Sequence, residues 1–200
     1  MKLLLCLLLL VSSFYDFAVA WSNRTAQEYY MRIAIELAKE AVASGGSPYG
    51  ALIVDPRKSK VVVKGRNHAG HNPIWHAEMD AINGLNNLLP QNTSVYAVAK
   101  DLELYTSAES CSMCMSAITW SGFGRVIYGT SIPYIESQGQ NQIDIRSVEV
   151  AKASAKFANT TVIGGILAEE TNKLYQRNSK YRKFIEESHR HIHHHSHVHN

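Results

Sequence analysis

The chain has 200 residues, a length typical of one domain that buries a single substantial core. Apolar residues make up 46% of it and charged residues 18%, which is ordinary for a soluble globular protein. The formal net charge of +3 is too small to indicate a nucleic-acid partner by itself.

The N-terminal stretch has the pattern of a secretory signal peptide. Lys2 precedes a short apolar run, and the small-x-small tripeptide AVA stands at residues 18–20. A membrane-spanning helix needs about 20 apolar residues, and Asp16 interrupts this run earlier. We therefore predict that residues 1–20 are a cleaved signal peptide, and that the mature protein is secreted without membrane contact. An uncleaved signal anchor is the alternative.

Cleavage would leave Cys111 and Cys114 as the cysteines of the mature chain, because Cys6 lies in the signal peptide. A secreted chain without a disulfide framework must be stabilised by an ordinary core. Acceptor triplets for N-glycosylation fit a secretory route, although such triplets also arise by chance. They begin at Asn23, Asn92 and Asn159.

A folded domain is predicted at residues 21–187. Thr25 and Glu28 form a capping box, and apolar residues then recur at helical spacing until SGGSP at residues 44–48. The β-rich runs at residues 49–55 and 60–67 flank the turn-like PRKS and predict a hairpin.

Helices and strands alternate along the rest of the domain. Helices are predicted at residues 74–89, from Cys111 onward, at 145–155 and in the stretch up to 187, and strands at 94–107, 125–129 and 160–167. This order predicts an α/β fold, a three-layer α/β/α sandwich around a mixed sheet of about five strands.

The C-terminal residues 188–200 hold seven of the ten histidines. Their irregular spacing argues against a simple purification tag. We predict a disordered tail that binds metal weakly, with a solvated end without function as the alternative.

His76, Cys111 and Cys114 form a candidate metal site. Zinc prefers imidazole nitrogen and thiolate sulfur, and a catalytic site offers three such ligands and leaves the fourth position to water. The two cysteines are predicted in the first turn of one helix, where free amides and the helix dipole favour thiolates. Residues three apart on a helix share a face. We therefore predict one zinc ion (Zn2+) per chain.

Glu78 lies two residues beyond His76, at the start of the same predicted helix. There it can take a proton from water and pass it to a leaving nitrogen without being a ligand. Three ligands and one free glutamate are typical of hydrolytic deamination of an amino-substituted ring. Two alternatives, neither of which uses Glu78, stay open. One is a redox Cys-x-x-Cys protein; the other is a non-catalytic zinc-binding protein with His68 or His71 as fourth ligand.

The motifs HAEMDAI and LYTSAESCSMCMSAITW together resemble the cytidine deaminase-like superfamily, whose signature is His-x-Glu followed by Pro-Cys-x-x-Cys on the next helix. The resemblance is specific over residues 47–128 and looser up to residue 175. LYTS and the Ala-Ile-x-Trp after the cysteines are most similar to the guanine deaminase and tRNA adenosine deaminase branch. The resemblance implies that fold, one zinc ion and a homodimer.

Transferred by position, the resemblance assigns the same three zinc ligands and gives the proton transfer to Glu78. Asn67, at the end of GRN, would hydrogen-bond the substrate base or its sugar; a turn residue without such a contact is the alternative. The backbone amide of Ala77 would contact the ring. Trp120 would line the base pocket, since aromatic faces stack on bases, or else belong to the core.

Two positions depart from the family pattern. Ser110 stands where proline is usual, which alters the helix entry but removes no ligand. Guanine deaminases carry an acid that contacts the purine after the strand following the zinc helix. Here that stretch offers Tyr134 or a shifted Glu136, so guanine itself is in doubt.

The predicted function is that of a secreted zinc-dependent deaminase, a hydrolase acting on C–N bonds of cyclic amidines. Its substrate would be a small molecule, namely a nucleobase, nucleoside or related amino-heterocycle, and its product ammonia. The signal peptide and the small charge argue against nucleic acid, and tRNA adenosine deamination is the alternative should the signal peptide prediction fail. The sequence alone does not specify the base.

Overall fold

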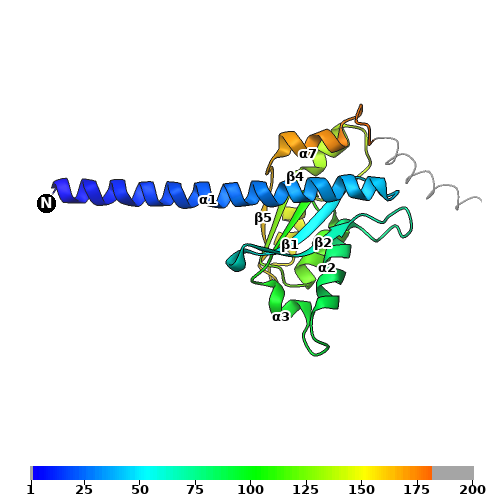
Figure 1. The fold of residues 1–200 in the computed structure, drawn as a ribbon, viewed down its shortest axis with the longest axis horizontal. Helices are drawn as coiled ribbons and strands as arrows, with labels where there is room; N and C mark the ends of the chain where they lie inside the picture. Colours follow the sequence, from blue (N-terminus) through cyan, green and yellow to red (C-terminus); the bar gives the residue numbers. More distant parts are fainter. Residues whose placement is uncertain (1, 182–200) are drawn as a thin grey trace, which may run out of the picture.

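The computed structural model describes residues 2–181, with side chains from residue 23 onward, and contains one five-stranded sheet between two layers of helices (Figure 1). The elements in chain order are α1 Lys2–Ala43, β1 Gly50–Asp55, the 3-10 turn Pro56–Lys58, β2 Lys60–Arg66, α2 Ala77–Leu88, α3 Val95–Ala99, β3 Glu103–Ala108, α4 Ser112–Trp120, β4 Arg125–Thr130, α5 Ile132–Ser137, α6 Ser147–Ala153, β5 Thr161–Ile163 and α7 Ala168–Tyr175.

The sheet is mixed, as predicted, with the strand order β2-β1-β3-β4-β5. Strand β1 pairs antiparallel with β2 and β3, whereas β3, β4 and β5 run parallel to one another. The predicted hairpin is the β1–β2 pair. Parallel neighbours require helical crossovers, which is why α4 and α6 stand between successive strands of the parallel half.

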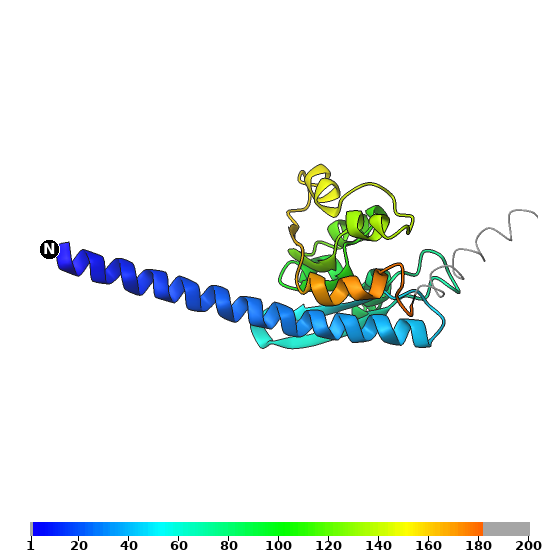
Figure 2. The ribbon, with the colours of Figure 1, turned by 90° about the horizontal axis from the view of Figure 1, so that it is seen from above.

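Alternate residues of the strands face the two helical layers, as the period of two requires. Leu52 and Tyr105 pack beneath α1, whereas Ile53 and Leu104 face α2 and α4. Figure 2 shows α1 and α7 along one side of the sheet and α4 and α6 on the other. The three-layer prediction is therefore confirmed.

Helix α1 runs without interruption from Lys2 to Ala43, so the box at Thr25 does not begin a helix in the intact chain. The leucine-rich stretch before it has high helix propensity and no glycine or proline that would end it. Only the C-terminal half of α1 packs on the sheet, and the other half projects away from the domain (Figures 1 and 2). None of the helices within residues 2–181 combines the length and the hydrophobicity needed to cross a bilayer.

Three further predictions of secondary structure need correction. Residues 95–99, predicted as strand, form the short helix α3, and β3 begins only at Glu103. Helix α5 was not predicted from the sequence. Helix α7 ends at Tyr175, well short of the predicted end, and the rest of the predicted domain from residue 182 and the histidine-rich tail lie outside the described residues.

Candidate active site

The three predicted zinc ligands converge from the N-termini of two helices. His76 is the residue that precedes the first turn of α2, and Cys111 occupies the same position before α4. Cys114 lies in the first turn of α4 and is fully buried. The His76 Nδ1 atom is 3.7 Å from the Cys111 Sγ atom and 3.5 Å from the Cys114 Sγ atom.

These distances match a tetrahedral zinc site. With zinc–sulfur bonds of about 2.3 Å and zinc–nitrogen bonds of about 2.05 Å, tetrahedral angles place nitrogen and sulfur about 3.6 Å apart. The two observed distances lie within about 0.1 Å of that value, and all three ligand atoms lie within 4.8 Å of one another. The residues therefore fit one zinc ion.

The protonation of the cysteines also suits a metal site. Hydrogen bonds from Cys114 and His76 lower the pKa of Cys111 to about 4, against the opposing effect of burial. The N-terminus of α4 favours the same thiolate. The proton shared with Cys111, together with burial, raises the pKa of Cys114, as expected when two thiols compete for one negative charge.

His76 faces both cysteines with the same ring nitrogen, Nδ1. Burial lowers the pKa of His76, but hydrogen bonding to Cys111 and the negative charges of Glu78 and Cys111 outweigh it and raise the pKa above its ordinary value. The loop that leads into α2 thus presents Nδ1 to the two sulfurs.

Two buried carboxylates line the same cavity, and their surroundings shift their pKa values in opposite directions. Burial raises the pKa of Glu78, and the negative charge of Cys111 adds to this effect. Burial acts on Glu109 in the same sense, but hydrogen bonds from Arg146, Ile132 and Ser147 outweigh it and hold the pKa of Glu109 below its ordinary value. Glu78 is therefore protonated more readily than an isolated glutamate, whereas the surroundings of Glu109 favour its ionised form.

The hydrogen bonds of Glu109 also occupy both of its oxygens. Arg146 Nε contacts Oε1 and Oε2 at 2.9 Å each, the Ile132 amide donates to Oε2 at 3.0 Å, and the Ser147 amide donates to Oε1 at 3.0 Å. A carboxylate so occupied is not free to exchange protons with a ligand. Glu78 is thus the acid–base candidate of this cavity.

The cavity over the metal ligands has a volume of about 360 Å³. Away from the metal ligands and the two glutamates, the lining residues are uncharged. Apolar atoms provide most of this surface, and side chains that can both donate and accept hydrogen bonds, such as Asn67, Asn141 and Gln142, lie among them. The lining residues are Ser47, Tyr49, Asn67, Ala69, Pro73, His76, Glu78, Glu109, Cys111, Asn141, Gln142 and Ile143.

Asn67 lines the cavity as predicted and is held in one orientation. Its Oδ1 atom accepts hydrogen bonds from the backbone amides of Ser47 at 3.2 Å and Ala69 at 3.0 Å. With Oδ1 occupied, the group that Asn67 can offer a ligand is its Nδ2 amide, a donor. Asn67 therefore both stabilises the turn, as the alternative prediction had it, and lines the cavity.

The other predicted substrate residues are not among the residues that line the cavity, although Ala77 directly follows the metal ligand His76. Ala77 is buried in the first turn of α2, where its amide has no intrahelical acceptor. Trp120 lines neither the cavity nor the core; it is 69% exposed and stacks on Phe157 with ring centroids 4.4 Å apart. Tyr134 and Glu136 belong to α5 and are not among the cavity residues; from this part of the chain, Asn141, Gln142 and Ile143 line the cavity.

Neither alternative reading of the cysteines gains support. His68 Nε2 faces Asp80 at 3.5 Å, and the metal-ligand cluster found within the described residues contains neither His68 nor His71. Cys111 and Cys114 are both free thiols directed at His76. Glu109 and Arg146 were not predicted from the sequence; the place of Glu109, directly before Ser110 and Cys111, was the one signal available.

Comparison with known proteins agrees with this geometry. The model of the cytidine and deoxycytidylate deaminase zinc-binding region matches residues 24–130. The tRNA-specific adenosine deaminase of Rickettsia felis is 31% identical over 72% of this chain and 94% of its own length. A probable cytosine deaminase of Schizosaccharomyces pombe is 36% identical over 51% of this chain and 59% of its own length.

Solved structures show the same fold. The guanine deaminase of Nitrosomonas europaea superposes with a TM-score of 0.63 at 23% identity, covering 80% of this chain and 84% of that one. The match to the family model spans the metal ligands, Glu78 and four of the five strands. The chain is therefore a member of the cytidine and deoxycytidylate deaminase family, whose zinc-dependent enzymes hydrolyse C–N bonds.

Proposed function

We propose that this deaminase acts on a free nucleobase, a nucleoside or a related amino-heterocycle and releases ammonia. The observation that carries the proposal is the pairing of a buried carboxyl group, Glu78, with a three-ligand metal group in a cavity whose other walls are uncharged and include several amide side chains. Neutral amides suit an uncharged ring that presents donors and acceptors side by side.

When bound, zinc supplies Lewis-acid activation of water at neutral pH. Glu78 takes a proton from the attacking water and passes it to the adjacent ring nitrogen as the oxygen bonds to the amino-bearing carbon. It then carries the remaining hydroxyl proton to the amino nitrogen as the C–N bond breaks, so that ammonia leaves and a carbonyl remains. The Asn67 amide and the backbone amide of Ala77 would hold the ring over the metal ligands during these steps.

Deamination of adenosine in tRNA is the second candidate. It is favoured by the name of the Rickettsia felis relative, of which the chain covers 94%. The net charge of +3 offers little attraction for a polyanion, and the predicted signal peptide would remove the enzyme from cytosolic tRNA. For these reasons we place the small-molecule substrate first.

Secretion, domain limits and assembly complete the proposal. We propose cleavage after residue 20, a domain at residues 21–187, a tail at residues 188–200, and a homodimer. The aromatic surface around Trp120 and Phe157 is a surface that a second copy could cover. Intact mass of the protein secreted by cultured eukaryotic cells tests the cleavage and glycosylation, and light scattering tests the dimer.

The deciding experiment measures zinc content and ammonia release with the purified protein. The panel contains cytosine, guanine, adenine and their nucleosides, with an unmodified tRNA transcript as a separate arm. The small-molecule proposal predicts about one zinc per chain and turnover of at least one panel member. Turnover of the transcript alone would establish the second candidate, and bound zinc without any turnover would refute both.

A further inference from the structure

The segment at residues 140–146 forms part of the cavity wall although it has no helix or strand of its own. It joins α5 to α6 and contributes Asn141, Gln142 and Ile143 to the lining. An irregular segment keeps one conformation only where side chains or backbone groups hold it. The contacts at its two ends are therefore informative.

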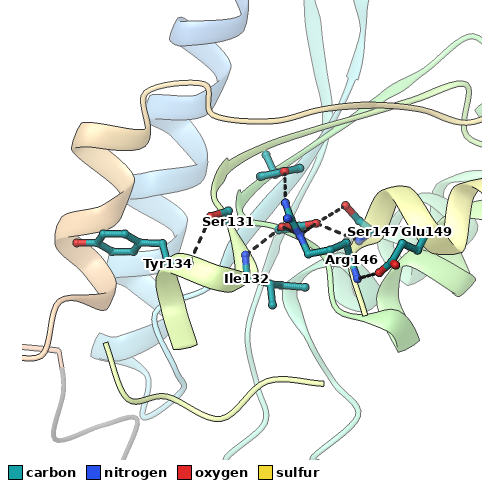
Figure 3. Close-up of polar contacts among 8 residues, drawn as sticks. Ser131, Ile132, Tyr134, Arg146, Ser147 and Glu149 are labelled. Carbon is teal, nitrogen blue, oxygen red and sulfur yellow. Dashed lines mark hydrogen bonds and ion pairs between the residues drawn. The ribbon is translucent and has the colours of Figure 1, made fainter. Parts of the chain in front are cut away.

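One end of the segment is fastened to the residue that precedes the zinc motif. Arg146 contacts both oxygens of Glu109 through Nε and the Tyr128 hydroxyl through Nη2, at 3.2 Å. The Glu109 side chain is fully buried, and the Arg146 side chain is 35% exposed. Figure 3 shows Ile132, Arg146 and Ser147 turned toward the same point from α5 and the start of α6.

The backbone of Arg146 is fixed as well. Its amide donates to Glu149 Oε2 at 2.7 Å in the capping box of α6 (Figure 3). At the other end of the segment, Gln140 Nε2 donates to the carbonyl of Tyr175 at 2.7 Å, and both residues are buried. The three cavity residues thus stand between two buried polar anchors, which restrict where their side chains can lie.

We infer that Arg146 is a positioning residue, which acts through Glu109 to hold the wall Asn141–Gln142–Ile143 in place against the metal ligands. Glu109 is two residues from Cys111, so this ion pair connects the substrate wall to the start of α4 directly. The predicted effect on KM rests on the proposed function, but the placement of the wall can be measured without a substrate.

The test compares Arg146→Met with a matched control. Glu109, the partner of Arg146, directly follows the C-terminal end of β3, and the control lies at the N-terminal end of that strand. Arg125 pairs with Glu103 at the start of β3, away from the cavity, so Arg125→Met also breaks an arginine–glutamate pair. A displacement of about 1 Å can cost a reaction up to about 100-fold. For the best panel substrate, we expect Arg146→Met to raise KM at least tenfold with kcat within about threefold and zinc unchanged. Arg125→Met should leave KM unchanged.

A second readout is hydrogen–deuterium exchange of the peptide that covers residues 139–146, in the full-length protein without substrate. Arg146→Met should accelerate exchange there while the peptide around Cys111 is unchanged, and Arg146→Lys should fall between the two. An unchanged KM together with unchanged exchange would overturn the inference. Loss of zinc, or a fall in kcat as large as the rise in KM, would also overturn it, because Glu109 and Arg146 would then belong to the metal centre. If Arg146→Met does not fold, the exchange of Arg146→Lys decides. Absence of turnover in the wild type would defeat the proposed function while leaving the exchange test intact.

Discussion

Replacement of Glu78 by glutamine should abolish turnover while leaving the metal site intact. Glutamine keeps the size of the side chain but cannot carry the proton. Glu78 is only 5% exposed, so bulk water has little access to substitute for it. General acid–base catalysis contributes about 10²- to 10⁴-fold, and Glu78 would serve both proton transfers. We therefore expect the upper end, about 10⁴ in kcat or about 5.4 kcal/mol of transition-state stabilisation.

The stability of the variant separates chemistry from misfolding. Burial and Cys111 raise the pKa of Glu78 above its unfolded value, so the ionised carboxylate destabilises the folded metal-free chain as pH rises through that unfolded value. Glutamine removes this penalty. The metal-free variant should therefore melt at or above the wild-type temperature at pH 7, as measured by circular dichroism.

Steady-state ammonia release and zinc content, measured on the same preparations, check the prediction. Glu169→Gln, an exposed change on α7, is the control and should behave as wild type. The reasoning would be refuted if Glu78→Gln kept more than a tenth of the wild-type kcat. It would also be refuted if zinc were lost together with activity, because Glu78 would then support the metal rather than the proton transfers.

Three further predictions address the metal site and its frame. Cys114→Ser should weaken zinc binding by more than about 100-fold in a chelator competition, because it removes a ligand rather than a supporting contact. In zinc-free protein at pH 6, iodoacetamide should modify Cys111 before Cys114, as peptide mapping would show. With a pKa of about 4, Cys111 is a thiolate at pH 6, whereas an ordinary thiol is only about 0.3% ionised at that pH. Equal labelling of the two cysteines, or labelling that zinc does not prevent, would contradict the prediction. Gly65→Ala should destabilise the fold by about 1–3 kcal/mol in urea denaturation, since the added carbon would lie 2.4 Å from the Ala77 carbonyl oxygen; an unchanged midpoint would show that α2 yields freely.

The metal half of the site was predictable because its signals are local. A spacing of two between His76 and Glu78, and of three between the cysteines, fixes which side chains share a helix start, and helix starts favour thiolates and metal ligands. The hairpin was equally local, with turn residues between two β-rich runs. Both predictions required no knowledge of contacts between distant segments.

The substrate half of the site was not predictable, because its residues come from segments far apart in the sequence. Glu109 and Arg146 are 37 residues apart, and neither belongs to a pattern that requires the other. The predicted position of Trp120 is wrong for a similar reason. An aromatic residue after the cysteines suits a pocket, but the periodicity of α4 turns this side chain outward, where it stacks on Phe157. The first half of the strand predicted at residues 94–107 is wrong, because valine and tyrosine favour strands in general, whereas residues 95–99 pack as a short helix; residues 103–107 do belong to β3.

This division bears on how the substrate is chosen. The family match ends at residue 130, so it contains the metal ligands and Glu78 but not the segment at residues 140–146. Relatives named for cytosine and for adenosine in tRNA both match this chain, so the matched chemistry does not by itself distinguish their rings. A common acid–base and metal centre can act on any amino-substituted ring that is held correctly over it. Changes at Asn141 and Gln142 should therefore alter the preference among panel substrates while sparing zinc, and changes at Glu78 should lower all activities alike.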